Sequence, residues 1–226
     1  MEIASGIHKI DNVSGANSYL IIADDAAVVV DTGMPGNERR IMEYAGSVGV
    51  KPSRLQCIVL THADIDHSGS AAKLRGLTGG KVEIHEADAP RLSGEKKLKE
   101  AKGAARILFG VMGPFMRFTP LKPDVTLRDS DRVLDLVVVH TPGHTDGSIS
   151  LYREGEVILV GDAMRTDSSG KPLLPPAAMT ADMGQAKDSL ARIAAYRFEM
   201  LLPGHGPPIT HDASNIMMDF VRREFR

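Results

Sequence analysis

The stretch THADIDHSGS, residues 61–70, decides how the rest of the chain is interpreted. It directly follows the apolar run LQCIVL, which has the length and composition of a buried strand. Within six residues it places His62, Asp64, Asp66 and His67, whose side chains are of types that bind metal ions. A helix cap formed by Asp66 alone would not account for the two histidines beside it. The stretch therefore predicts a metal-binding loop at the end of a strand.

Other potential ligands also follow strand-like runs. Glycines next to three of them allow the sharp backbone turns that let strand-end side chains converge. The segments are VVVDTG with Asp31, VVVHTPGHTDG with His144, VILVGDA with Asp162 and LLPGHG with His205. His140 lies within a strand run and is expected to be structural. His85 ends the run KVEIH, where a place in the pocket is one alternative and a packed or solvent-capped side chain is the expected one. His8 and His211 have no such setting, and no role is assigned to them.

The distribution of apolar residues predicts an α/β fold. Short β-branched runs end in turn residues, and helical patterns lie between them. The expected strands are 18–23, 26–33, 55–62, 81–85, 135–143, 148–152 and 156–163, and the expected helices are 37–49, 68–80, 181–197 and 213–225. A strand ending in an acid, then a helix, then a strand ending in histidine occurs twice, which suggests two related halves. Chance could also produce this echo.

Composition restricts the class of protein. A chain of 226 residues with 42% hydrophobic and 25% charged residues fits one soluble domain, 1–226. A net charge of -2 disfavours nucleic acid as a partner. No apolar run approaches the ~20 residues of a membrane span. The beginning of the chain does not resemble a signal peptide. Cys57 is the only cysteine, and with no disulfide possible we expect a cytoplasmic protein.

The motifs H-x-D-x-D-H, T-P-G-H-T, G-D-A and P-G-H-G, in this order, resemble those of the metallo-β-lactamase superfamily. The resemblance implies an αββα four-layer sandwich with a dinuclear metal site. One metal would be held by His62, Asp64 and His144, and the other by Asp66, His67 and His205, with Asp162 bridging both. Asp66 and Asp162 are the residues expected to be catalytic, and Asp31 is expected to support the ligands without binding metal.

Position 64 departs from the commonest family pattern, which has histidine there. Either Asp64 still binds the first metal, or that metal is lost. An aspartate oxygen reaches about as far as the nearer ring nitrogen of histidine, which favours a ligand. Three bound carboxylates and a bridging hydroxide would neutralise two divalent ions, a harder site than one with a third histidine. Zinc is the expected metal, with iron or manganese as alternatives.

The resemblance implies a hydrolase in which metal-bound hydroxide attacks an ester, thioester or lactone. The alternatives are an iron-dependent oxidoreductase of the persulfide-dioxygenase kind and a metal-binding scaffold without turnover. The expected partner is a small-molecule substrate with an apolar portion, with neither nucleic acid nor membrane involved. A homodimer is left open.

Residues 93–120 interrupt the alternation of strands and helices and predict a helical insertion. The apolar residues recur at three- to four-residue steps, as on one helix face. One interpretation is a helical hairpin packed on the domain, or a dimer contact. The other is an apolar lid that accepts an acyl chain, formed by Phe109, Met112, Phe115, Met116 and Phe118.

Overall fold

The computed structural model describes residues 1–98 and 118–225, which divide into two compact units. The N-terminal unit comprises residues 1–98 and 118–127, and the C-terminal unit residues 128–225. Most of the helical insertion predicted at 93–120, including four of the five lid residues, lies outside the described residues. Phe118 is described, and it packs partly buried against the core of the N-terminal unit. The insertion, the lid and the single domain stay predictions.

The N-terminal unit is built on a seven-stranded sheet in which the strands follow one another in chain order. The first four strands pair antiparallel, and the last four pair parallel. The strands are β1 (Glu2–Ala4), β2 (Ile7–Lys9), β3 (Tyr19–Ile22), β4 (Ala27–Val30), β5 (Leu55–Leu60), β6 (Lys81–His85) and β7 (Val125–Leu127). The parallel order places the segments that follow β4, β5 and β6 at the same edge of the sheet.

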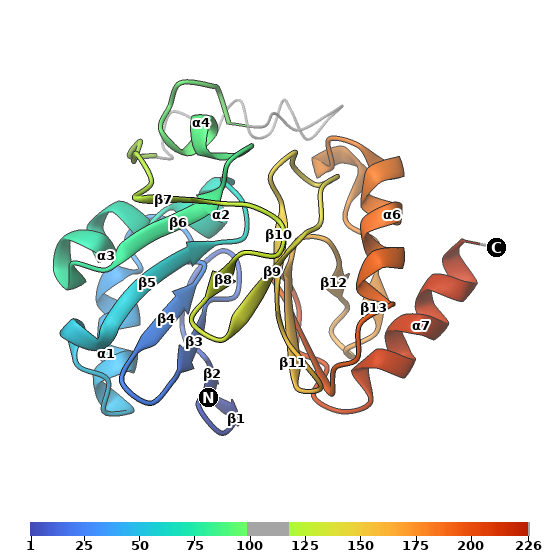
Figure 1. The fold of residues 1–226 in the computed structure, drawn as a ribbon, viewed down its shortest axis with the longest axis horizontal. Helices are drawn as coiled ribbons and strands as arrows, with labels where there is room; N and C mark the ends of the chain where they lie inside the picture. The colour runs from blue at the N-terminus through green and yellow to red at the C-terminus, as the bar shows by residue number, and fades with distance from the viewer. Residues whose placement is uncertain (99–117, 226) are drawn as a thin grey trace. The chain divides into compact units, whose positions relative to one another are not determined.

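Helices α1 and α3 cover one face of this sheet (Figure 1). Both are amphipathic: Ile41 and Leu74 are fully buried with Ile58 and Leu60 of β5. The helical elements of the unit are α1 (Glu38–Ser47), η1 (Pro52–Arg54), α2 (Ile65–Ser68), α3 (Ala71–Thr78) and α4 (Ala89–Leu92). Gly79 ends α3 in the left-handed conformation, as the paired glycines predict.

The C-terminal unit contains a five-stranded sheet in the order β14-β11-β10-β9-β8 and a separate pair of short strands. Its strands are β8 (Arg132–Val133), β9 (Leu136–His140), β10 (Ile149–Arg153), β11 (Val157–Gly161), β12 (Arg165–Thr166), β13 (Pro172–Leu173) and β14 (Met200–Pro203). Strands β10 and β11 form an antiparallel hairpin that turns over residues 154–156.

Helices of the C-terminal unit pack on this sheet through a core that includes Leu190, Ile193, Met217 and Phe220. The helical elements are η3 (Ala177–Met179), α6 (Met183–Ile193) and α7 (Ala213–Glu224). Asp182 caps α6 by accepting hydrogen bonds from two backbone N–H groups of its first turn. Within residues 1–98 and 118–225, no helix has the length and apolar character needed to cross a membrane.

The repeated order noted in the sequence has a structural counterpart in each unit. Strands β4 and β5 are parallel neighbours, followed by Asp31 and by the loop that carries His62. Strands β11 and β14 are also parallel neighbours, followed by Asp162 and His205. Because parallel neighbours end at the same sheet edge, each unit brings an acid and a histidine together there.

Candidate metal centre

The metal-binding loop of the N-terminal unit runs from the end of β5 into the short helix α2. His62 and His67 are fully buried, and their ring centroids lie 4.0 Å apart. Asp64 is the residue before α2, and Asp66 lies within it. The segment from the end of β5 through α2 thus presents two imidazoles and two carboxylates close together, as the sequence predicts.

Asp31 determines which ring nitrogens are available. Its Oδ2 lies 2.7 Å from Nδ1 of His67 and accepts the hydroxyl proton of Thr61 at 2.8 Å. The Thr61 oxygen, having donated its proton, lies 3.1 Å from Nδ1 of His62 and can accept from it. Both histidines are thereby held with Nδ1 protonated, so that each Nε2 carries a lone pair. The supporting role predicted for Asp31 extends to both rings.

The distances between these nitrogens and the carboxylates fit a metal ion. Nε2 of His62 lies 3.6 Å from Oδ2 of Asp64, and Nε2 of His67 lies 4.0 Å from Oδ2 of Asp66. A direct hydrogen bond would be shorter, at about 2.7–3.2 Å. Two ligand atoms at ~2.1 Å from one tetrahedral ion lie ~3.4 Å apart. The donor set and its spacing therefore suit a divalent metal.

The C-terminal unit repeats this arrangement around Asp162. Oδ2 of Asp162 lies 3.5 Å from Nε2 of His144 and 3.6 Å from Nε2 of His205. His144 is buried, whereas the His205 side chain is 38% exposed and so accessible to solvent. One carboxylate oxygen at this distance from two imidazoles matches the role expected of a bridging ligand. The bridge itself stays a prediction.

Backbone packing fixes the His144 loop. Gly143 has a φ of 129°, and a Cβ there would lie 2.2 Å from the backbone nitrogen of Ala186 in α6. Only glycine fits so close to the helix. The Ser189 hydroxyl, also on α6, donates to the carbonyl of Pro142 at 2.7 Å. The start of α6 therefore holds the turn that presents His144.

The loop that carries His205 is fixed by β12. The backbone N–H of Thr166 donates to the carbonyl of His205 at 3.1 Å, and its hydroxyl donates to the carbonyl of Pro207 at 2.7 Å. Gly206 lies against Thr166 with no room for a Cβ. The strand pair β12–β13, which no sequence pattern predicted, thus acts as a support for a candidate ligand.

The histidines without a predicted metal role lie in ordinary structural settings. His140 hydrogen-bonds through Nε2 to the carbonyl of Asp146 at 2.9 Å, in agreement with a structural role. His85 is buried and accepts from the backbone N–H of Ala87. His8 lies 3.3 Å from the Tyr44 hydroxyl, and exposed His211 lies 3.7 Å from Glu199.

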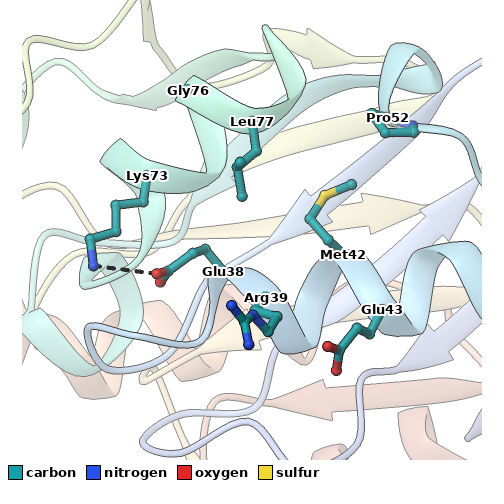
Figure 2. A pocket seen from close by; sticks show the side chains of 8 residues that line it. All are labelled: Glu38, Arg39, Met42, Glu43, Pro52, Lys73, Gly76 and Leu77. Carbon is teal, nitrogen blue, oxygen red and sulfur yellow. Dashed lines mark hydrogen bonds and ion pairs between the residues drawn. The ribbon is translucent and has the colours of Figure 1, made fainter.

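A groove on the N-terminal unit is a separate feature. It has a volume of ≈ 810 Å³ and lies between α1 and α3 (Figure 2). Its charged lining includes Glu38 and Lys73, which pair at 3.3 Å, and its apolar lining includes Met42 and Leu77. No histidine or cysteine lines the groove, so its chemistry differs from that of the metal-binding loop.

Sequence reasoning missed the side chains that hold the metal-binding loop in place. Thr61 orients His62, and Thr32 donates to the carbonyl of His67 at 2.9 Å. Asp88 accepts from the backbone of Ala63 at 2.9 Å. The only signal in the sequence was that Asp88, like the metal-binding loop, closely follows a strand-like run.

Comparison with known proteins shows which family the chain resembles. The family model of the metallo-beta-lactamase superfamily matches residues 11–205. The chain is 30% identical over 235 residues to the probable metallo-hydrolase YflN of Bacillus subtilis, covering 92% of this chain and 87% of the relative. It is 26% identical over 209 residues to the human acyl-coenzyme A thioesterase MBLAC2, covering 84% and 72%.

A solved structure shows the same fold. A metallo-beta-lactamase family protein of Thermus thermophilus superposes with a TM-score of 0.74 at 24% identity, covering 99% of this chain and 81% of that protein. The chain therefore belongs to the metallo-beta-lactamase superfamily. The predicted resemblance and the metallo-β-lactamase-like α/β fold class are both confirmed.

Proposed function

We propose that the protein is a dinuclear metal-dependent hydrolase that cleaves an ester, thioester or lactone, and that a thioester is the preferred bond. The observation that carries the proposal is the spacing of imidazole nitrogens and carboxylate oxygens, 3.5–4.0 Å, in both units. Membership of a superfamily whose relatives are named metallo-hydrolases supports it.

In this proposal seven side chains hold two divalent metals, with zinc expected first and iron or manganese as alternatives. The first would be bound by His62, Asp64 and His144 and the second by Asp66, His67 and His205, with Asp162 shared. When bound, such metals lower the pKa of water and polarise the carbonyl under attack. Asp31 holds Nδ1 of His67 directly and Nδ1 of His62 through Thr61. The Nε2 lone pairs of both rings therefore point away from Asp31 and are available to bind metal.

The preference for a thioester rests on a relative. The human protein to which this chain is 26% identical is named an acyl-coenzyme A thioesterase. A thiolate is a better leaving group than an alkoxide, so a site with three carboxylates and reduced positive charge would still cleave a thioester.

Two measurements together test the function. Protein purified without added metal is analysed for metal content, and its turnover is measured on acyl thioesters beside oxygen esters and lactones of the same acyl groups. We expect two metals per chain and the highest kcat/KM on the thioesters. One iron per chain would instead favour an oxidoreductase. Bound metal without turnover on any of the three bond types would indicate a scaffold.

A further inference from the structure

We propose that Asp88 is a positioning residue for the metal-binding loop, holding the peptide between His62 and Asp64 so that both stand at ligand spacing. The inference rests on the proposed metal site and extends it to a residue outside the ligand set. It assigns Asp88 to the half of the loop that carries His62 and Asp64.

The position of Asp88 follows from the sheet. β5 and β6 are parallel neighbours, so the segments that follow them leave the same edge. Ala63 comes three residues after the end of β5, and Asp88 three residues after the end of β6. At this edge Oδ2 of Asp88 accepts the backbone N–H of Ala63 at 2.9 Å.

This hydrogen bond is out of reach of bulk solvent. The Asp88 side chain and Ala63 are both 0% exposed. Arg91, whose Nε lies 3.7 Å from Oδ1 of Asp88, supplies the opposite charge. A buried backbone N–H needs a partner, so without the carboxylate the Ala63 peptide would have to move to find another.

Ala63 affects the positions of two candidate ligands, His62 and Asp64, because it lies between them in the chain. On its other side, the carbonyl of Ala63 accepts from the Ser68 hydroxyl at 3.1 Å. Ala63 is thus held at both its N–H and its carbonyl by side chains. A shift of this residue would change the 3.6 Å separation of His62 Nε2 and Asp64 Oδ2.

Asp88 and Asp31 have different roles in holding the metal-binding loop. Asp31 contacts His67 directly and reaches His62 through Thr61, and so sets ring tautomers. Asp88 holds the N–H of Ala63 and so acts on the position of the backbone. Loss of Asp88 should therefore weaken the metal bound by His62 and Asp64 more than the metal bound by Asp66 and His67.

Asp124 provides a matched control in the same unit. It also accepts a backbone N–H, that of Val82, at 2.9 Å, and it also pairs with an arginine, Arg75, at 3.6 Å. Val82 lies in β6, away from the metal-binding loop. Asp124→Ala removes the same kinds of contact without touching the residues around the candidate ligands.

The test is titration of the metal-free full chain with Co²⁺, followed by its visible absorption spectrum. We expect Asp88→Ala to bind one of two cobalt ions at least about tenfold more weakly, with an altered spectrum. Asp88→Asn, whose amide oxygen can still accept from Ala63, should restore most of the affinity. Asp124→Ala should titrate like the unaltered protein, even where urea shows it to be less stable.

If Asp88→Ala does not fold, Asp88→Glu replaces it, because it keeps the charge and displaces the carboxylate by one methylene. Wild-type cobalt affinity and spectrum in either variant would overturn the inference, as would an equal loss in Asp124→Ala. Absence of turnover by the unaltered, fully loaded protein would instead contradict the proposed function and leave the role of Asp88 standing.

Discussion

At the scale of single residues, Asp64 is the departure that most affects the chemistry. Its Oδ2 lies 3.6 Å from Nε2 of His62, at the spacing of two ligands of one ion. This distance is difficult to explain if Asp64 binds no metal. The geometry favours the interpretation in which Asp64 takes the place of the usual histidine.

Asp64→Ala is therefore expected to lower the metal content toward one per chain and to reduce turnover sharply, whereas Asp64→His should keep both metals. Elemental analysis of the two variants, purified side by side, makes the comparison. Two full equivalents of metal in the alanine variant would show that Asp64 is not a ligand.

Cys57 gives a second prediction for a single residue. Burial, together with the neighbouring Glu83 carboxyl group, raises the pKa of its thiol to about 12. At pH 8 its thiolate fraction is then on the order of a thousandfold below that of a free cysteine. Greater intrinsic nucleophilicity offsets part of this.

We expect Cys57 to react at least tenfold more slowly than a free thiol with a disulfide reagent at pH 8. Glu83→Gln should accelerate the reaction, and unfolding in urea should bring it to the free-thiol rate. A native protein that is labelled as fast as the unfolded one would contradict this account.

At the scale of elements, Asp129 and Arg192 join the end of β9 to α6. Asp129 accepts from Arg192 at 2.8 and 2.9 Å and from the backbone N–H of His140 at 2.8 Å, and Arg192 also donates to the carbonyl of His140. Burial raises the pKa of Asp129, but these hydrogen bonds outweigh it and hold the pKa below its ordinary value.

Because the folded pKa of Asp129 is depressed, its contribution to stability is present above the unfolded pKa of about 3.9 and is lost as pH falls through the folded pKa. Both side chains are about 40% exposed, which limits the contribution to about 1 kcal/mol. Asp129→Asn should lower the unfolding free energy in urea at pH 7 and lose this effect in strong acid. Asp219→Asn, whose side chain is exposed on α7, serves as the control, and a pH-independent difference would contradict the prediction.

The long elements could be predicted from sequence because their own residues determine them. β4, β5, β9, β10 and β11 lie within runs of β-branched and aliphatic residues, and α6 has an amphipathic pattern. The short strands β12 and β13 have two residues each, and pairing with each other rather than composition determines them. Ser70 precedes α3 without capping it, since its hydroxyl donates to the carbonyl of Met34.

The candidate site was predictable to a similar extent. Ligand types at strand ends can be recognised in one sequence, because metals restrict the residues that bind them. Asp88 is 25 residues from its partner Ala63, and the bond uses only the backbone N–H of that partner, which leaves no pattern in the sequence. A contact of this kind between a side chain and a distant backbone N–H can be identified only when the register of β5 and β6 is known.

At the scale of the whole molecule, the proposed ligands come from both halves of the chain. A metal that binds only the folded protein stabilises it by about 4 kcal/mol when its concentration is 1,000 times Kd. For a chain of this size that is a shift in Tm on the order of 10 °C. Removal of metal with a chelator should therefore lower the Tm by this amount, and restoring zinc should reverse it.

Asp162 tests whether both metals depend on one residue. Its Oδ2 is 3.5 Å from His144 and 3.6 Å from His205, ligands assigned to different metals in the proposal. Asp162→Asn removes the charge that offsets two ions, so we expect it to lose both metals together and to melt where the chelated wild type melts. His211→Ala, exposed and outside the ligand set, should retain the metal content and Tm of the wild type. If Asp162→Asn kept one tightly bound metal, Asp162 would be a ligand of a single ion, and the two sites would fill independently.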